Sequence, residues 1–169
     1  MIMKSQYMKS ALITAVVSLA FATPALAVTD TTTFQVTTTV NDSCTVTAAD
    51  MAFGAYDAGA GVLNTTSTIT ATCTAGTSYD IGLDVGSNNA NVTSTTRAMD
   101  DGASSYLDYE LYLDSDRTTV LGTTVATDTR SNASATAGAN TETVYGQIPG
   151  GQYVPAASYS DTINVTITY

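Results

Sequence analysis

Acidic side chains are the main groups in this sequence that could do chemistry. The 169 residues contain 15 Asp and Glu against 5 Lys and Arg, and no His. Without imidazole, neither a Ser–His–Asp triad nor a His-ligated metal site can be built. Paired carboxylates could support glycoside hydrolysis. The candidate pairs are Asp100 with Asp101, Asp108 with Glu110, and Asp114 with Asp116. Such acids are common in turns and on solvated strand faces, so we expect no enzyme activity.

The same acids bear on metal ions and nucleic acids. Asp114-Ser-Asp116 and Asp100-Asp-Gly102 are only faintly like calcium loops, because neither has the D-x-[DN]-x-[DN]-G spacing followed by a distal Glu. We therefore expect no metal and no cofactor. The formal net charge of −10 would repel the phosphate backbone, which excludes nucleic acid as a partner.

The first 27 residues have the pattern of a secretory signal peptide. Lys4 and Lys9 precede the apolar run at residues 11–22, and Pro24 leads into an A-x-A cleavage site that ends at Ala27. The run is too short to cross a bilayer, so we expect an exported chain with no membrane insertion. Cleavage would remove both lysines and leave three arginines. Without lysine, a Ser–Lys dyad and a Schiff base are excluded.

The two cysteines, Cys44 and Cys73, are expected to form one disulfide, because exported chains mature under oxidising conditions. A catalytic or metal-binding role is the weaker interpretation, since the chain offers no His and no further thiol beside them.

Hydrophobic residues alternate with polar ones in several segments. The alternation is clearest at residues 34–40, 69–73, 107–113 and 163–169, and weaker strands are expected at 44–47, 79–85 and 143–148. Turn signals separate these segments, and residues 131–141 are interpreted as a loop. About seven short strands predict an antiparallel β-sandwich in one domain.

The two ends of the predicted sandwich leave two interpretations open. Residues 28–40 carry an apolar stripe of their own before the first cysteine, and the last strand ends at Tyr169. A sandwich lacking a closing strand would expose an edge that can pair with another chain. Alternatively, residues 28–40 are the first strand of their own domain. Periodicity favours neither.

The sequence resembles the spore coat protein U domain family, which includes pilins of the archaic chaperone–usher type. The segments that carry the resemblance are residues 33–47 (TFQVTTTVNDSCTVT), 53–57 (FGAYD), 107–114 (LDYELYLD), 144–149 (VYGQIP) and 159–169 (YSDTINVTITY). They span essentially the whole chain after residue 27 and occur in the order expected for the family.

The resemblance implies an all-β fold, namely an incomplete immunoglobulin-like antiparallel sandwich that lacks its last strand and is completed by a donor strand from another subunit. Residues 28–40 would then be an N-terminal donor-strand extension and residues 41–169 the pilin domain. The donor side chains would be Phe34, Val36, Thr38 and Val40, and the last strand would form a groove wall with Ile163, Val165, Ile167 and Tyr169.

The implied function is that of a structural pilin subunit of a surface fibre, assembled by donor-strand exchange and supporting adhesion and biofilm formation. The implied partners are neighbouring subunits, a periplasmic chaperone and an outer-membrane usher, and the implied location is a fimbrium reached through the periplasm. The alternative is a self-contained secreted coat or binding module without strand exchange.

Overall fold

The computed structural model describes residues 26–88 and 97–169, and this part of the chain is all-β. Its strands are β1 (Cys44–Ala48), β2 (Leu63–Cys73), β3 (Tyr79–Leu83), β4 (Arg97–Asp100), β5 (Tyr106–Tyr112), β6 (Arg130–Asn132), β7 (Gly138–Ile148) and β8 (Val165–Thr168). Nothing among the described residues forms a helix that could cross a membrane. Nearly all of the predicted leader lies outside the described residues.

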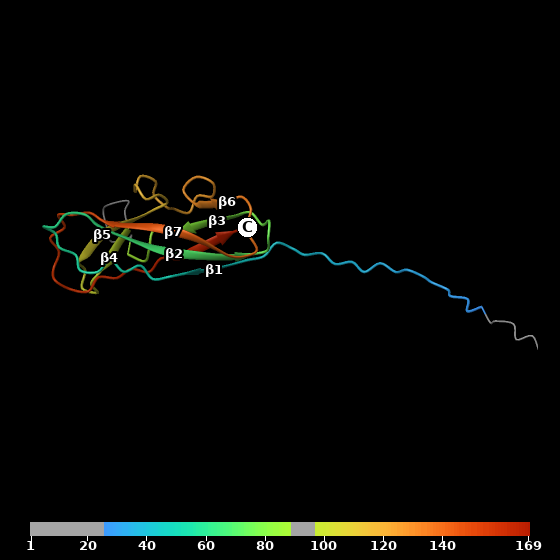
Figure 1. Ribbon diagram of the computed structural model, residues 1–169. Coiled ribbons are helices and arrows are strands. Elements are labelled where there is room, and N and C mark those ends of the chain that lie inside the picture. Colours follow the sequence, from blue (N-terminus) through green and yellow to red (C-terminus); the bar gives the residue numbers. More distant parts are fainter. Residues whose placement is uncertain (1–25, 89–96) are drawn as a thin grey trace, which may run out of the picture. The chain divides into compact units, whose positions relative to one another are not determined.

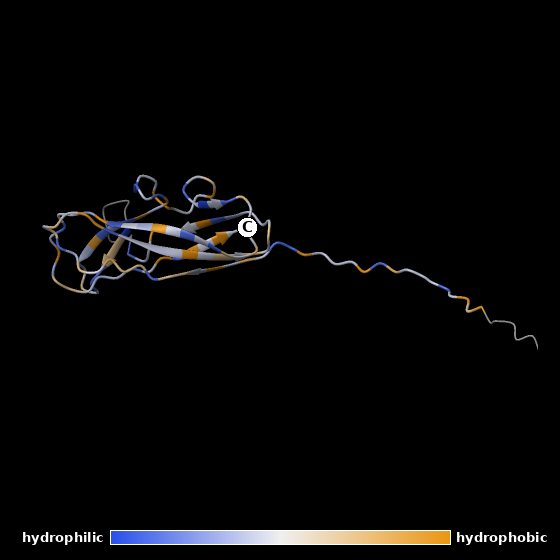
Figure 2. Ribbon diagram, viewed as in Figure 1, coloured by the Kyte–Doolittle hydropathy of each residue, from blue (hydrophilic) through white to orange (hydrophobic). Residues whose placement is uncertain are grey.

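The larger sheet has the strand order β1-β2-β7-β5-β4 (Figure 1). Its centre is the antiparallel pair of β2 and β7, which runs from Leu63 opposite Ile148 to Cys73 opposite Gly138. Threonines alternate with apolar residues along β2, so β-branched side chains cover the outer face while Ile69 and Ala71 are buried. Orange and paler segments follow one another along the strands in Figure 2.

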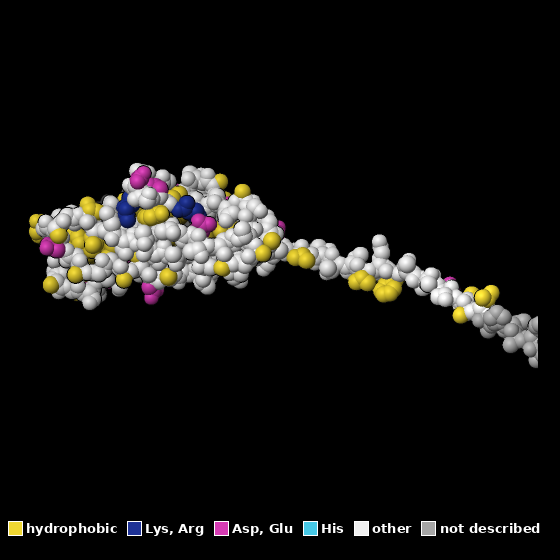
Figure 3. All heavy atoms as spheres, viewed as in Figure 1, with side chains coloured by type: hydrophobic (Ala, Val, Ile, Leu, Met, Phe, Trp, Pro, Cys, Tyr) yellow, Lys and Arg dark blue, Asp and Glu magenta, His cyan; other side chains and the backbone are white. Residues whose placement is uncertain are grey.

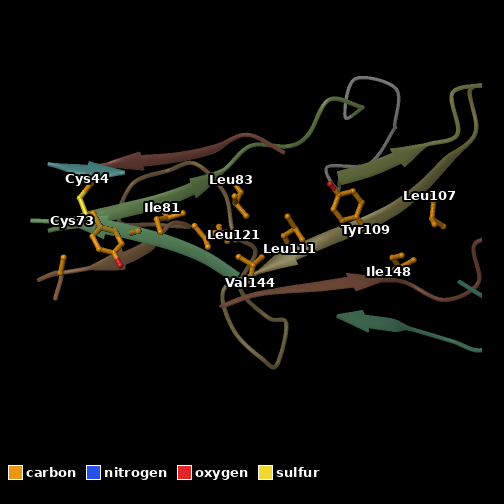
Figure 4. Packing of buried hydrophobic residues seen from close by; sticks show 14 residues of the cluster. Cys44, Cys73, Ile81, Leu83, Leu107, Tyr109, Leu111, Leu121, Val144 and Ile148 are labelled. Atoms are coloured by element: carbon orange, nitrogen blue, oxygen red, sulfur yellow. A yellow bond between two sulfur atoms is a disulfide. The ribbon is translucent and has the colours of Figure 1, made fainter. Parts of the chain in front are cut away.

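The smaller sheet has the order β6-β3-β8, and β8 is one of its edges. Ile81 of β3 lies opposite Ile167 of β8, and Leu83 lies opposite Val165. Side chains of both sheets meet in one core, in which Leu83 and Leu121 approach Leu111 and Val144 (Figure 4). The described chain is therefore a two-sheet antiparallel sandwich, as predicted.

The predicted disulfide between Cys44 and Cys73 is present. The two residues are opposite each other where β1 begins and β2 ends. The disulfide therefore holds the short β1 against its only strand partner in the described chain.

Some predictions from the sequence are wrong. β4 and β6 were missed, because their sequences, RAMD and RSN, show no alternation of apolar and polar residues. Residues 131–141 are not all loop, since β6 extends into them and β7 begins at Gly138. Glu110 was expected on a solvated face but is buried, because it pairs with Arg97 of β4.

The arginines of the described chain serve the fold. Each guanidinium donates to a backbone carbonyl oxygen: Arg97 to Leu83, Arg117 to Gly146, and Arg130 to Leu113. Dark blue and magenta atoms are sparse on the face shown in Figure 3. All three arginines thus donate hydrogen bonds to backbone carbonyl oxygens of the domain.

The chain divides into two units, Met1–Thr38 and Thr39–Tyr169. Residues 26–43 contain no helix and no strand, although the alternation at 34–40 predicts one. Phe34 and Val36 are 86% and 85% exposed. We call residues 28–40 the N-terminal arm. The apolar stripe of this arm is not buried.

Candidate functional site

An apolar cavity of about 360 Å³ opens between the segment after β1 and the segment that leads into β8. Ala48 and Met51 lie on one side, and Ile163 and Val165 on the other. The floor consists of core side chains from both sheets, including Ile69, Leu83, Leu111 and Val144. The cavity therefore reaches down to core side chains that are themselves buried.

A second cavity of about 770 Å³ lies beside the first. Both are lined by Met51, Phe53, Met99 and Tyr159, so the two cavities are adjacent, and we call them together the open groove. Phe53 packs edge-on against Tyr109, with 6.2 Å between ring centroids. Gly146 of β7 makes room for this packing, because a Cβ at that position would collide with Met51 and Phe53.

The strands that border the open groove have unused edges. Among the described strands, β1 pairs only with β2 and β8 only with β3. Ala48, the last residue of β1, and Val165, the first of β8, line the same cavity. The two strands therefore run in opposite directions along the groove. Exposed strand edges of this kind present N–H and C=O groups to which another strand can bind.

Asp161 holds the β8 side of the groove to the floor. Its Oδ2 accepts a hydrogen bond from the Tyr109 hydroxyl at 2.8 Å, and its Oδ1 accepts from the backbone N–H of Ser87 at 2.9 Å. Burial, followed by the hydrogen bond to Asp161 and its negative charge, raises the pKa of Tyr109 well above its usual range. Tyr109 therefore stays a neutral donor, and the Asp161 carboxylate faces the groove.

Asp84 fixes the next stretch of the same wall. Its carboxylate accepts from the backbone N–H of Asn164 at 3.0 Å and from the N–H of Gly86 at 3.1 Å. Burial opposes ionisation, but hydrogen bonds from Asn164 and Gly86 and the charge of Arg97 outweigh it and lower the pKa of Asp84. The charged carboxylate ties the start of β8 to the end of β3.

The four residues predicted to form a groove wall from the last strand differ in whether they line the open groove. Ile163 and Val165 line the open groove, and Ile167 is half-buried against the core beyond it. Tyr169 is 59% exposed and does not line either cavity. The predicted role of these four residues as a groove wall stays a prediction.

Several groove residues were missed by sequence reasoning. Met51, Phe53, Met99 and Tyr159 lie in irregular segments or at a strand of four residues, where no period marks them. Phe53 and Tyr159 occur in the motifs quoted above, which was the only available signal. Asp161 stands in the alternation of the last strand, at an otherwise apolar position.

The carboxylates considered for catalysis serve local structure. Asp101 accepts from the N–H groups of Ala103 and Ser105, and Asp114 accepts from those of Thr118 and Thr119. These bonds shape turns rather than a cleft between two acids.

The comparisons with known proteins agree with this architecture. The family model "Spore Coat Protein U domain" matches residues 30–166. A chain of the crystal structure of the CsuC–CsuE chaperone–tip adhesion subunit pre-assembly complex, from archaic chaperone–usher Csu pili of Acinetobacter baumannii, is similar with a TM-score of 0.54 and 20% sequence identity. The match covers 78% of this chain but only 40% of that one. No curated protein sequence matches.

Proposed function

Since the chain belongs to the spore coat protein U domain family, we propose that it is a pilin, a structural subunit of a surface fibre assembled by donor-strand exchange. The observation that carries the proposal is the open groove, which is lined mainly by apolar side chains and whose cavity of about 360 Å³ lies between unused edges of β1 and β8. The complement to such a groove is a strand with one apolar face. The N-terminal arm has that pattern, with Phe34, Val36, Thr38 and Val40 on one side.

The free energy of burying apolar side chains favours binding of the exposed arm to the groove of another subunit. Burying Phe34, Val36 and Val40 would contribute about 1.5–3 kcal/mol each, or roughly 5–9 kcal/mol together. Association and ordering take back several kcal/mol, so backbone hydrogen bonds to the groove edges must add to the affinity. Because the arm and the groove are different surfaces, the contact repeats head to tail and builds an open filament.

The polarity of the donor strand follows from the same geometry. The arm is joined to its own domain by residues 41–43, which span about 10 Å when extended. β1 begins at the end of the groove at which β8 ends. Because the arm precedes β1 in the chain, each subunit's own arm is attached at that end. A donor running antiparallel to β8 places its domain at the opposite end, so successive domains do not collide.

The proposal includes domain boundaries, partners and location. Residues 1–27 are the signal peptide, 28–40 the donor-strand extension and 41–169 the pilin domain. The similar crystal structure is of a chaperone–subunit complex. We accordingly assign this chain a periplasmic chaperone that protects the groove, an outer-membrane usher, and neighbouring pilins at the cell surface. The fibre would support adhesion and biofilm formation, with no catalytic role.

The experiment uses residues 28–169 with residues 32–40 repeated after Tyr169 through a flexible linker. We expect a soluble monomer with a much higher melting temperature, whereas the unextended chain polymerises or is unstable alone. In the matched control, the repeated copy carries Phe34→Asp and Val36→Asp, and the stabilisation should disappear. An unextended chain that is already a stable monomer, unaffected by the added strand, would favour a self-contained secreted module instead.

A further inference from the structure

The open groove contains a polar position that matches a polar position in the arm. Asp161 is the carboxylate that accepts the Tyr109 hydroxyl beside Ile163 and Val165, in a cavity whose other polar lining residues besides the tyrosines are Asp50, Ser67 and Ser160. Thr38 is the polar residue among Phe34, Val36 and Val40. We propose that Asp161 is a specificity determinant which binds the Thr38 hydroxyl of the incoming arm and so sets the register of the donor strand. The inference rests on the proposed function.

Asp161 has an acceptor position that no described residue uses. Its Oδ1 accepts hydrogen bonds from the N–H groups of Ser87 and Thr162 and from the side-chain amide of Asn88, at 2.7–3.2 Å. Its Oδ2 accepts only from Tyr109 among the described residues. A carboxylate oxygen can accept two hydrogen bonds, so Oδ2 can take a hydroxyl that enters from the groove. A threonine offers that hydroxyl, whereas a valine of the same shape leaves a polar group unpaired.

The wall beside Asp161 has a strict alternation. Tyr159, Asp161, Ile163 and Val165 are half-buried, and the residues between them are exposed. Residues of one parity in the arm therefore meet residues of one parity in the wall. In an antiparallel pair, placing Thr38 opposite Asp161 puts Val36 opposite Ile163 and Phe34 opposite Val165.

This register also matches side-chain size to space. Phe34, the largest inward residue of the arm, reaches the cavity of about 360 Å³ that is floored by Ile69, Leu83, Leu111 and Val144. Val40 comes opposite Tyr159, which lines both cavities. A shift by two residues toward Tyr169 would place Thr38 opposite Ile163 and leave its hydroxyl without a partner.

The test uses the unmodified chain, residues 28–169, as acceptor, so that no variant can misfold. Synthetic peptides of residues 31–42 compete with the arms during polymerisation, and the concentration for half-inhibition is measured. We expect Thr38→Val to weaken inhibition about tenfold, because the lost partner is a charged group. Thr38→Ser should stay within about twofold of the natural peptide. Thr39→Val, the same change on the outward face, is the matched control and should also stay within about twofold.

A second measurement reads the register directly. Chains carrying Val36→Cys and Ile163→Cys should form disulfide-linked multimers under mild oxidation, because directly opposite Cβ atoms lie about 4.5–5.5 Å apart. The pair Val36→Cys and Val165→Cys, displaced by one step of the alternation, should link poorly.

The outcomes separate this inference from the proposed function. If Thr38→Val inhibits as well as or better than the natural peptide, the groove selects by apolar burial alone and Asp161 has no role in recognition. Efficient linking through Val165 rather than Ile163 also overturns the register. If the natural peptide does not inhibit and the chain does not polymerise, strand exchange itself is refuted.

Discussion

Arg97 and Glu110 form a buried ion pair between the adjacent strands β4 and β5. The Arg97 guanidinium also donates to the carbonyl oxygens of Leu83 and Leu121, at 3.1 and 2.7 Å. Leu83 ends β3 in the smaller sheet, so one side chain connects the two sheets. Arg97 thus supplies hydrogen-bond donors to the carbonyl oxygens of both leucines.

Replacement of Arg97 tests this connection. Arg97→Met leaves the Glu110 carboxylate buried without its partner, so we expect the free energy of unfolding to fall by about 3–5 kcal/mol. Urea unfolding of the chain with the repeated arm would measure it. Arg117→Met is the control, because Arg117 lies on a partly exposed turn over Tyr145 and should cost less than about 1 kcal/mol. Equal losses in the two variants would contradict a special role of the buried pair.

Gly86 tests the packing around Asp161. Gly86 has a φ of +83°, and a Cβ there would collide with the Asp161 carboxylate. Gly102 has a φ of +75° with no atom within 4 Å of such a Cβ. Gly102→Ala should therefore cost about 1 kcal/mol from backbone strain alone. Gly86→Ala should cost clearly more in urea unfolding and should weaken binding of the arm peptide. If both variants lose the same free energy of unfolding, the Asp161 carboxylate moves away from the added methyl group at no cost in stability.

The disulfide stabilises one border of the open groove. Cys44 and Cys73 are 29 residues apart, so replacing both with Ser should lower the free energy of unfolding by about 3.5 kcal/mol on the chain-entropy estimate. Because β1 has no strand partner besides β2 in the described chain, the loss should also reduce polymerisation. Unfolding and polymerisation of the natural chain with and without dithiothreitol provide the comparison. Polymerisation at the natural rate after reduction would contradict it.

The raised pKa of Tyr109 predicts a loss of stability at alkaline pH. Its pKa is raised in the folded state, first by burial and then by Asp161, whereas an unfolded tyrosine titrates near pH 10. The folded chain holds the proton more tightly, so this contribution is complete below pH 10 and is lost as the pH rises above it. Tyr109→Phe should show a decline shallower by up to about 1.4 kcal/mol per pH unit. The free energy of unfolding of both chains is measured with urea between pH 9 and 11. If it falls equally steeply in the natural chain and in Tyr109→Phe, Tyr109 is not the source of the decline.

Alternation along the chain was sufficient to predict β2, β5 and β8. One face of β2, β5 and β8 packs on the core, so period-two patterns in residues 69–73, 107–113 and 163–169 report a local property. The disulfide was predictable because the sequence holds two cysteines and a secretory leader pattern. The family motifs extended these predictions to an incomplete sandwich.

Other features depended on the tertiary structure, because their causes lie far apart in the chain. Glu110 is buried only because Arg97, 13 residues away, reaches it from β4, and no local pattern reports such a pair. Met51 and Phe53 became groove residues because Gly146 leaves space for them on β7. Local periodicity records which side of a strand is buried. The contacts of irregular segments and the course of an unfilled groove are decided only when both sheets are assembled.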